Sequence, residues 1–144
     1  MRFGVVAFVL IVVAFVLVSR LVPPRARLPV WILIVLAGVV PWSSWMGHAH
    51  WDGVEWVPFT RNVRLRDVVL NVLFYAPIGY FLAARRASTR RNVVVTAAVV
   101  GFALSVATEL SQVFSHGRFP AMTDVVSNLT GAVIGAWVGR VRAR

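Results

Sequence analysis

The chain opens with a long apolar stretch, FGVVAFVLIVVAFVLVSRL at residues 3–21, in which Arg20 is the only charged residue. As an α-helix these residues would rise about 28 Å, close to the ~30 Å thickness of the hydrocarbon core of a bilayer. A strand with open edges would leave its backbone N–H and C=O groups unsatisfied in lipid, so a helix is expected. The stretch therefore predicts a membrane-spanning helix.

A cleaved signal peptide is the alternative for this first stretch. Its positively charged leading region would consist of Arg2 alone, and no Ala-x-Ala cleavage site follows it. Instead, three arginines come directly after the apolar residues, at Arg20, Arg25 and Arg27. Arginines in this position are typical of a retained anchor whose N-terminus lies outside the cell.

Four further apolar stretches are long enough to cross a membrane as helices, and they cover residues 28–46, 67–84, 92–114 and 122–138. The 144 residues are 59% hydrophobic, with a mean hydropathy of +0.79. A soluble domain of this size cannot bury so much apolar surface. We therefore predict an all-α, polytopic integral membrane protein of the cell membrane with about five transmembrane helices.

The charged residues predict the orientation of these helices. All 15 basic residues are arginine, and the formal net charge is +10. Most of the arginines fall on one side of the predicted membrane, after the first and third stretches and in the C-terminal tail. Cytoplasmic loops are enriched in basic residues, so we expect the N-terminus outside and the C-terminus inside. Because the same clustering accounts for the net charge, we expect no nucleic acid as a partner.

All five acidic residues fall on the opposite, outer side of the predicted membrane. Three of them belong to polar pairs at the outer ends of the last three predicted helices: Asp67 with Asn71, Glu109 with Gln112, and Asp124 with Asn128. Residues three or four apart share a helix face, and the alternating helix directions bring the three pairs to one depth. Arg118 lies in the turn between the last two helices. We predict that these seven residues form one site.

Three interpretations of this site compete, because an unpaired charge in lipid costs a few kcal/mol. One is a structural lock, in which Arg118 neutralises an acid and the amides bond across helices. A second is a pocket for a polar headgroup, in which Arg118, with Arg64 or Arg66, holds phosphate and the carboxylates and amides contact hydroxyls or amines. The third is a catalytic site in which a desolvated Glu109 or Asp124 acts as acid or base.

Metal and nucleophilic chemistry find little support in the sequence. No His-Glu-x-x-His or comparable local spacing is present, so we expect neither a metal ion nor another cofactor. The absence of cysteine excludes disulfides, thiolate metal sites and a cysteine nucleophile. Serines lie near His116, but no nucleophile elbow accompanies them to support a catalytic triad.

The last predicted helix carries glycines at four-residue spacing, Gly131, Gly135 and Gly139. Such a stripe lets two helices approach closely. We expect its partner to be the helix predicted over 67–84 or over 92–114 of the same chain, and a homodimer through the three glycines is the alternative. In the third stretch Pro77 lacks a backbone N–H, so we expect a kink there.

Tryptophans fall near both predicted membrane boundaries. Trp31 and Trp137 lie at the inner boundary, and Trp42 and Trp45 lie near the outer one. Aromatic residues are enriched where lipid meets water, so we expect these four side chains at the membrane interface.

A series of short motifs runs through the second half of the chain: Pro58-Phe59, Asn71 with Tyr75-Ala76-Pro77-Ile78-Gly79, Glu109-Leu110-Ser111-Gln112, Gly117-Arg118, Asp124, Asn128 and Gly131. Their order and spacing together resemble the VanZ-like family. The resemblance covers residues 56–144, which we treat as a VanZ-like region with three helices. Residues 1–55 then hold two N-terminal helices and the start of the outer loop.

The resemblance implies a small bacterial membrane protein of the cell envelope. The family's named member is associated with resistance to the glycopeptide teicoplanin, and glycopeptides act on cell-wall precursors outside the cytoplasmic membrane. The predicted site lies on that side. The chain departs from the family at Thr123, where a second acid is common, and at Tyr75, where Phe is common.

From these observations we expect the outer site to bind a membrane lipid or the headgroup of a lipid-linked cell-wall precursor. One alternative is an intramembrane enzyme that acts on a lipid-linked substrate, with Glu109 or Asp124 as acid or base. Another is a structural protein that stabilises a partner in the membrane through its glycine stripe. A transporter is disfavoured, because the five stretches show no inverted repeat.

Overall fold

The computed structural model describes residues 2–40, 45, 48–60, 63–85, 90–116 and 119–142. Within these ranges the chain is all-helical, as predicted. The helices are α1 (Arg2–Leu21), α2 (Pro24–Val39), α3 (Leu65–Arg85), α4 (Arg90–Gln112) and α5 (Met122–Arg142). The described part of the outer loop contributes two isolated bridges, which pair Trp45 with Ser115 and Glu55 with Ala121.

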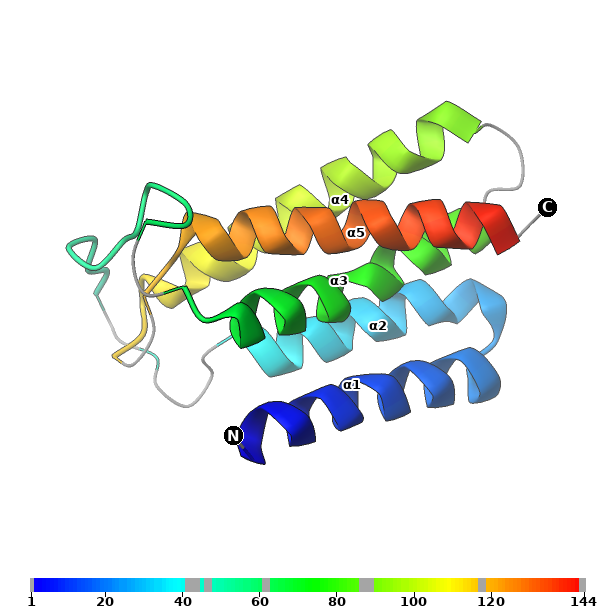
Figure 1. The fold of residues 1–144 in the computed structure, drawn as a ribbon, viewed down its shortest axis with the longest axis horizontal. Helices are drawn as coiled ribbons and strands as arrows, with labels where there is room; N and C mark the ends of the chain where they lie inside the picture. Colours follow the sequence, from blue (N-terminus) through cyan, green and yellow to red (C-terminus); the bar gives the residue numbers. More distant parts are fainter. Residues whose placement is uncertain are drawn as a thin grey trace.

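The helices alternate in direction (Figure 1). Helices α1, α3 and α5 run one way, and α2 and α4 run the other. One end of the molecule therefore collects the N-terminus, the long loop before α3 and the loop before α5, and we call it the loop end. All five acidic residues belong to this end, as the sequence predicts. The direction in which the molecule crosses the membrane, N-terminus out and C-terminus in, stays a prediction.

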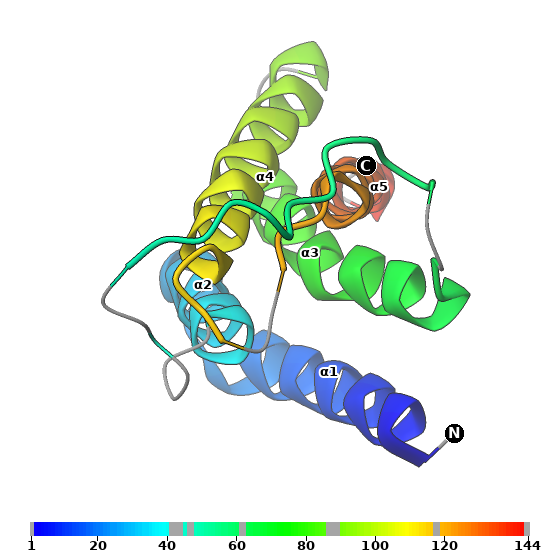
Figure 2. The same ribbon diagram turned by 90° about the vertical axis from the view of Figure 1, so that its left-hand side faces the viewer.

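Helix α3 is the centre of the bundle, because it packs against each of the other four helices. Its most extensive partner is α5, and α4 covers the pair (Figure 2). On its other side α3 contributes Phe81 to an aromatic cluster with Phe15 of α1 and Trp31 of α2. The ring of Phe15 stacks on that of Phe81 with 5.5 Å between centroids. These contacts join the two N-terminal helices to the rest of the bundle.

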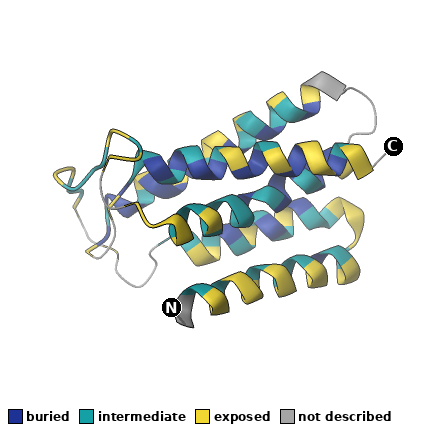
Figure 3. Ribbon diagram, in the orientation of Figure 1, coloured by how far each residue is buried: buried dark blue, intermediate teal, exposed yellow. Residues whose placement is uncertain are grey.

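Three of the described helices are long and apolar enough to cross a membrane, over Gly4–Leu21, Leu65–Arg85 and Asn92–Gln112. Helix α1 is the most exposed, and apolar side chains cover its outward faces (Figure 3). Helix α2 has 16 residues and is therefore about 24 Å long. Helix α5 is less apolar, because it contains polar residues such as Thr123, Ser127 and Asn128. These three side chains are buried inside the bundle. The fold thus matches a membrane protein whose polar groups face its own interior.

Helices α3 and α5 approach each other through glycines on both sides. A Cβ added at Gly135 would overlap the carbonyl oxygen of Ala76, and one at Gly131 would overlap that of Val72. In the reverse direction, a Cβ at Gly79 of α3 would overlap the carbonyl oxygen of Ala132. The stripe on α5 therefore packs against α3 of the same chain. The homodimer through these glycines stays a prediction, and it would have to use positions that α3 already fills.

Trp31 lies deeper than the sequence predicts. We expected it at the membrane interface, but its side chain is fully buried in the aromatic cluster. Its indole N–H donates a hydrogen bond of 2.9 Å to the carbonyl oxygen of Phe74. That carbonyl lies next to the carbonyl of Leu73, which Pro77 leaves without its usual backbone donor. Trp31 is thus a core residue that ties α2 to the proline-containing turn of α3.

Candidate functional site

Two of the predicted polar residues meet at the loop end of α3 and α5. The side-chain amide of Asn71 donates a 2.7 Å hydrogen bond to the Asp124 carboxylate. Asp124 lies in the first turn of α5, as Asp67 does in α3. Negative charge is stabilised at a helix N-terminus, where backbone N–H groups are unpaired and the helix dipole is positive. The helix starts therefore lower the cost of placing these two carboxylates at the edge of a membrane.

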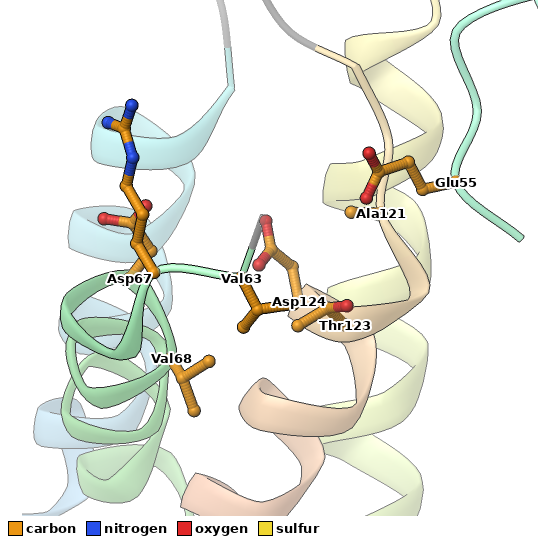
Figure 4. Close-up of a pocket in the computed structure, with 8 residues that line it drawn as sticks. Glu55, Val63, Asp67, Val68, Ala121, Thr123 and Asp124 are labelled. Atoms are coloured by element: carbon orange, nitrogen blue, oxygen red, sulfur yellow. The ribbon is translucent and has the colours of Figure 1, made fainter. Parts of the chain in front are cut away.

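A polar pocket of about 180 Å³ opens between the starts of α3 and α5 (Figure 4). Its lining includes Arg64 and three carboxylates, those of Glu55, Asp67 and Asp124. Figure 4 shows Asp67 and Glu55 on opposite sides of the pocket, with Asp124 between them. Asp67 also forms a 2.9 Å ion pair with Arg66, and both side chains are about half exposed. Such a surface pair contributes under about 1 kcal/mol, which leaves Asp67 available to another partner.

Glu109 is buried and lies apart from this pocket. One carboxylate oxygen accepts a 3.1 Å hydrogen bond from the Gln112 amide, and the other accepts a 2.9 Å bond from the backbone N–H of Ala121. Glu109 also lines a small apolar hollow, together with Trp51 and Trp56 of the outer loop. Glu109 therefore ties the end of α4 to the segment that leads into α5.

The loop that precedes α3 is hydrogen-bonded to the segment that leads into α5. The N–H of Glu55 donates to the carbonyl of Pro120, and the N–H of Met122 donates to the carbonyl of Glu55, each at 2.9 Å. Phe59 has a backbone φ of 61°, in the left-handed region that residues other than glycine rarely adopt. Its N–H donates a 2.9 Å bond to the hydroxyl of Thr123, which holds this loop conformation in place. These bonds fix Glu55 against the start of α5, where it borders the polar pocket.

A second polar layer lies deeper, between α3, α4 and α5. Asn128 of α5 donates a 2.9 Å bond to the hydroxyl of Ser105 in α4. The Thr108 hydroxyl donates to the Ser105 carbonyl at 2.9 Å and lies 3.1 Å from the Tyr75 hydroxyl of α3. Because Thr108 has used its only proton, Tyr75 must donate to it. All four residues are at most 2% exposed, so this layer fastens three helices together inside the bundle.

Replacing Tyr75 by Phe is expected to lower the free energy of unfolding by about 1 kcal/mol, because it deletes one interhelical hydrogen bond and keeps the ring. Thermal unfolding in detergent measures the change. Tyr80→Phe is the matched control on the same helix, because the Tyr80 hydroxyl makes no hydrogen bond within the described ranges. A Thr108→Val background should abolish the effect of Tyr75→Phe. Equal effects of both tyrosine substitutions would contradict the bond.

The six predicted site residues that the structure describes thus occupy three places rather than one. Asp67, Asn71 and Asp124 lie at the polar pocket or one hydrogen bond from it, whereas Glu109 and Gln112 hold the loop segment. Asn128 belongs to the deeper layer. Arg118 lies outside the described residues. Sequence reasoning named Glu55 as an outer acid without placing it in the site, and the bridge to Ala121 that brings it there has no sequence signal.

Within the described ranges, no group of three or more His, Asp or Glu side chains is arranged to hold a metal ion. Although three carboxylates line the polar pocket, they lie around its sides, and Arg64 shares the lining. A cation would have to compete with this guanidinium. The pocket is therefore better suited to an organic group with both charges than to a bare metal ion.

A family model described as VanZ/LLP1 matches residues 5–142, nearly the whole chain. The match extends through α1 and α2, beyond the region 56–144 that carries the short motifs. No curated protein and no solved structure matches the chain.

Proposed function

The chain belongs to the VanZ/LLP1 family, and from this premise we propose that it is a multi-pass cell-membrane protein whose polar pocket binds the headgroup of a membrane lipid or of a lipid-linked cell-wall precursor. The observation that carries the proposal is the composition of the pocket, with Arg64 beside three carboxylates. A guanidinium suits phosphate, and carboxylates suit ammonium or hydroxyl groups. The proposed ligand therefore carries phosphate next to an amine or several hydroxyls.

The size of the pocket supports a headgroup rather than a larger molecule. About 180 Å³ corresponds to roughly six water molecules, whereas drug-sized ligands occupy cavities of about 300–1,000 Å³. A glycopeptide antibiotic is too large to enter it. If the family's association with teicoplanin resistance extends to this protein, we propose that it acts through the lipid-linked precursor and not by sequestering the antibiotic.

The two alternative functions have weaker support. The catalytic interpretation needs a carboxyl group that exchanges protons with a substrate, but both oxygens of Glu109 accept hydrogen bonds from the protein itself. Asp124 borders the polar pocket and is the better candidate for an acid or base there. The structural-partner interpretation relies on the glycine stripe, which packs against α3. We therefore place headgroup binding first.

Native mass spectrometry of the full-length protein, released from nanodiscs, tests the proposal. Phosphatidylethanolamine offers a primary ammonium next to a phosphate, and phosphatidylcholine offers the same phosphate without an N–H donor. We expect a phosphatidylethanolamine adduct that the variant Asp67→Asn weakens about tenfold, because it loses one charge-assisted contact. Asp52→Asn is the matched control, as an exposed acid of the outer loop with the same change in charge.

The same experiment identifies a precursor if nanodiscs are prepared from the host's own lipid extract, since the adduct mass then gives the ligand class. Equal adducts with both test lipids would show that the carboxylates do not recognise an ammonium. Equal weakening by Asp67→Asn and Asp52→Asn would assign the effect to general surface charge. The first result would exclude an amine-bearing headgroup as the ligand, and the second would contradict the proposed pocket.

A further inference from the structure

A second pocket lies at the opposite end of the molecule, which holds the α1–α2 turn and the C-terminus. It measures about 390 Å³, and its lining brings together arginines from three helices: Arg20 of α1, Arg27 of α2 and Arg142 of α5. Its remaining lining residues are Phe15, Val16, Ser19 and Tyr80. No acidic side chain belongs to this end, because all five lie at the loop end. The three arginines therefore line this pocket without an acidic side chain beside them.

Arginines at this end have an ordinary explanation, since they orient the protein in the membrane and sit near the negative ends of α1 and α5. Orientation alone does not account for three arginines from three helices that line one cavity. Like charges placed there repel one another, and an anion among them would offset the repulsion. Their shared cavity points to a bound anion.

The geometry of Arg27 supports this inference. Its Nε donates a 2.9 Å hydrogen bond to the carbonyl oxygen of Val22, in the turn between α1 and α2. This bond fixes the guanidinium plane and leaves the two terminal nitrogens to donate elsewhere. A prepositioned guanidinium loses less freedom when it binds an anion, which is why arginine is favoured for phosphate.

Ser19 adds an unused donor to the same pocket. Other helix hydroxyls in the structure donate to a carbonyl three or four residues earlier, as Thr96, Ser127 and Thr130 do. The Ser19 hydroxyl is buried and has no hydrogen-bond partner in the described part of the chain. A buried polar group without a partner is costly, so a hydrogen-bond acceptor brought to this hydroxyl would be favourable.

The apolar side of the pocket indicates which anion fits. Phe15, Val16 and Tyr80 border the arginines, and α1 continues from there as a helix whose outward faces are apolar and exposed. A ligand that places a phosphate between the arginines would lay a hydrocarbon chain along α1. Basic pockets between membrane helices on the cytoplasmic side are suited to anionic lipid headgroups.

We propose that Arg20, Arg27 and Arg142 bind the phosphate of an anionic phospholipid, whose acyl chain packs along α1. This site is separate from the polar pocket at the loop end and does not depend on the function proposed for it. Phosphatidylglycerol is a suitable probe, because it carries a phosphate with a net negative charge and no ammonium. Its glycerol hydroxyls also suit the polar pocket at the loop end, so binding is assigned to the arginine site by the arginine variants.

The test compares phosphatidylglycerol with phosphatidylcholine by native mass spectrometry and thermal unfolding of the full-length protein. We expect saturable binding of phosphatidylglycerol that Arg20→Gln and Arg142→Gln each weaken about tenfold, through loss of a charge-assisted contact. Arg140→Gln is the matched control: it removes the same charge from the last turns of α5 but does not border the pocket. We expect less than about a twofold effect from it.

Thermal unfolding in a neutral detergent separates binding from folding. Without the lipid, both pocket variants should be about as heat-stable as the wild type, because relief of repulsion between like charges offsets the loss of a favourable charge at the helix C-terminus. Lower stability there would make the arginines part of the fold and overturn the proposal. Equal effects of Arg140→Gln and Arg142→Gln would overturn it as well, by assigning the binding to general surface charge.

Inorganic phosphate distinguishes the two sources of the anion. If the acyl chain contributes, phosphate added to the same samples should neither raise the unfolding temperature as phosphatidylglycerol does nor displace the lipid. Full displacement by phosphate would show that the site holds a free anion, and the lipid assignment would be wrong. The variant Asp67→Asn of the loop end should leave the part of phosphatidylglycerol binding that depends on Arg20 and Arg142 unchanged, which keeps this result independent of the first pocket.

Discussion

Gly135→Ala is expected to destabilise the protein by about 3 kcal/mol or more, although alanine normally favours a helix over glycine by about 1 kcal/mol. The reason is the contact between α5 and α3. A Cβ at position 135 would overlap the carbonyl oxygen of Ala76, and the atom next to it in that peptide group is also too close. A backbone group cannot rotate away as a side chain can, so the two helices would have to separate.

The separation would spread beyond position 135, because α3 and α5 form the largest helix interface in the bundle. Gly79 of α3 faces α5 in the same way, and its Cβ would overlap the Ala132 carbonyl. We therefore expect Gly79→Ala to cost as much as Gly135→Ala. The double variant should be less stable than either, since each substitution pushes the same two helices apart.

Thermal unfolding in detergent, followed by tryptophan fluorescence, measures these changes. Gly4→Ala is the control, because its nearest neighbour is the flexible side chain of Arg66 and it should leave stability unchanged or slightly raised. If Gly135→Ala were as stable as the wild type, α3 and α5 would not pack in this manner. If it abolished a dimer while the monomer kept its stability, the homodimer through Gly131, Gly135 and Gly139 would be the correct alternative.

The sequence predicts the helices and their order well, because long apolar stretches admit few other structures in a membrane. It also places the acids at one end, which follows from the alternating helix directions. The boundary of the second helix was less accurate. We expected it to reach residue 46, but α2 ends at Val39. Pro41 accounts for this end, because the residue before a proline disfavours the helical conformation.

The partners of the polar residues could not be predicted from spacing. Periodicity shows that Asp124 and Asn128 share a face of α5, but not which helix that face meets. In the structure, Asp124 meets Asn71 of α3, and Asn128 meets Ser105 of α4. Glu109 turns away from both toward a loop backbone. A backbone donor has no sequence signature, which is why one predicted site became three places.

Departures from the family pattern become understandable from local contacts. At the position where the family commonly has Phe, the hydroxyl of Tyr75 has a partner in Thr108. At the position where an acid is common, Thr123 keeps an oxygen acceptor and uses it to bond the Phe59 N–H. In both cases the side chain differs from the common residue of the family, but its hydroxyl takes part in a hydrogen bond within the chain. Neither partner could be identified before the helices were placed side by side.

Glu109→Ala is expected to lower the free energy of unfolding by roughly 3 kcal/mol, because it leaves two donors without an acceptor. These are the N–H of Ala121 and the amide of Gln112, and Gln112 is itself buried. The cost should be concentrated at the loop end. Ala121 is bridged to Glu55, so release of this segment would also displace one carboxylate of the polar pocket.

Hydrogen exchange locates the effect, because the Ala121 N–H should lose protection in Glu109→Ala while the amides of α3 remain protected.

Glu109→Gln separates anchoring from acid–base chemistry. Its amide oxygen still accepts one hydrogen bond, so an anchoring role predicts that most stability, loop protection and headgroup binding survive. A catalytic role predicts instead that Glu109→Gln keeps the fold and the bound lipid but prevents any turnover of that lipid, which mass spectrometry would detect in the wild type alone. If the wild type alone turned over the bound lipid, the two hydrogen bonds of Glu109 would serve to position a catalytic carboxyl group. Catalysis would then be the main role of Glu109, and anchoring of the loop segment would support it.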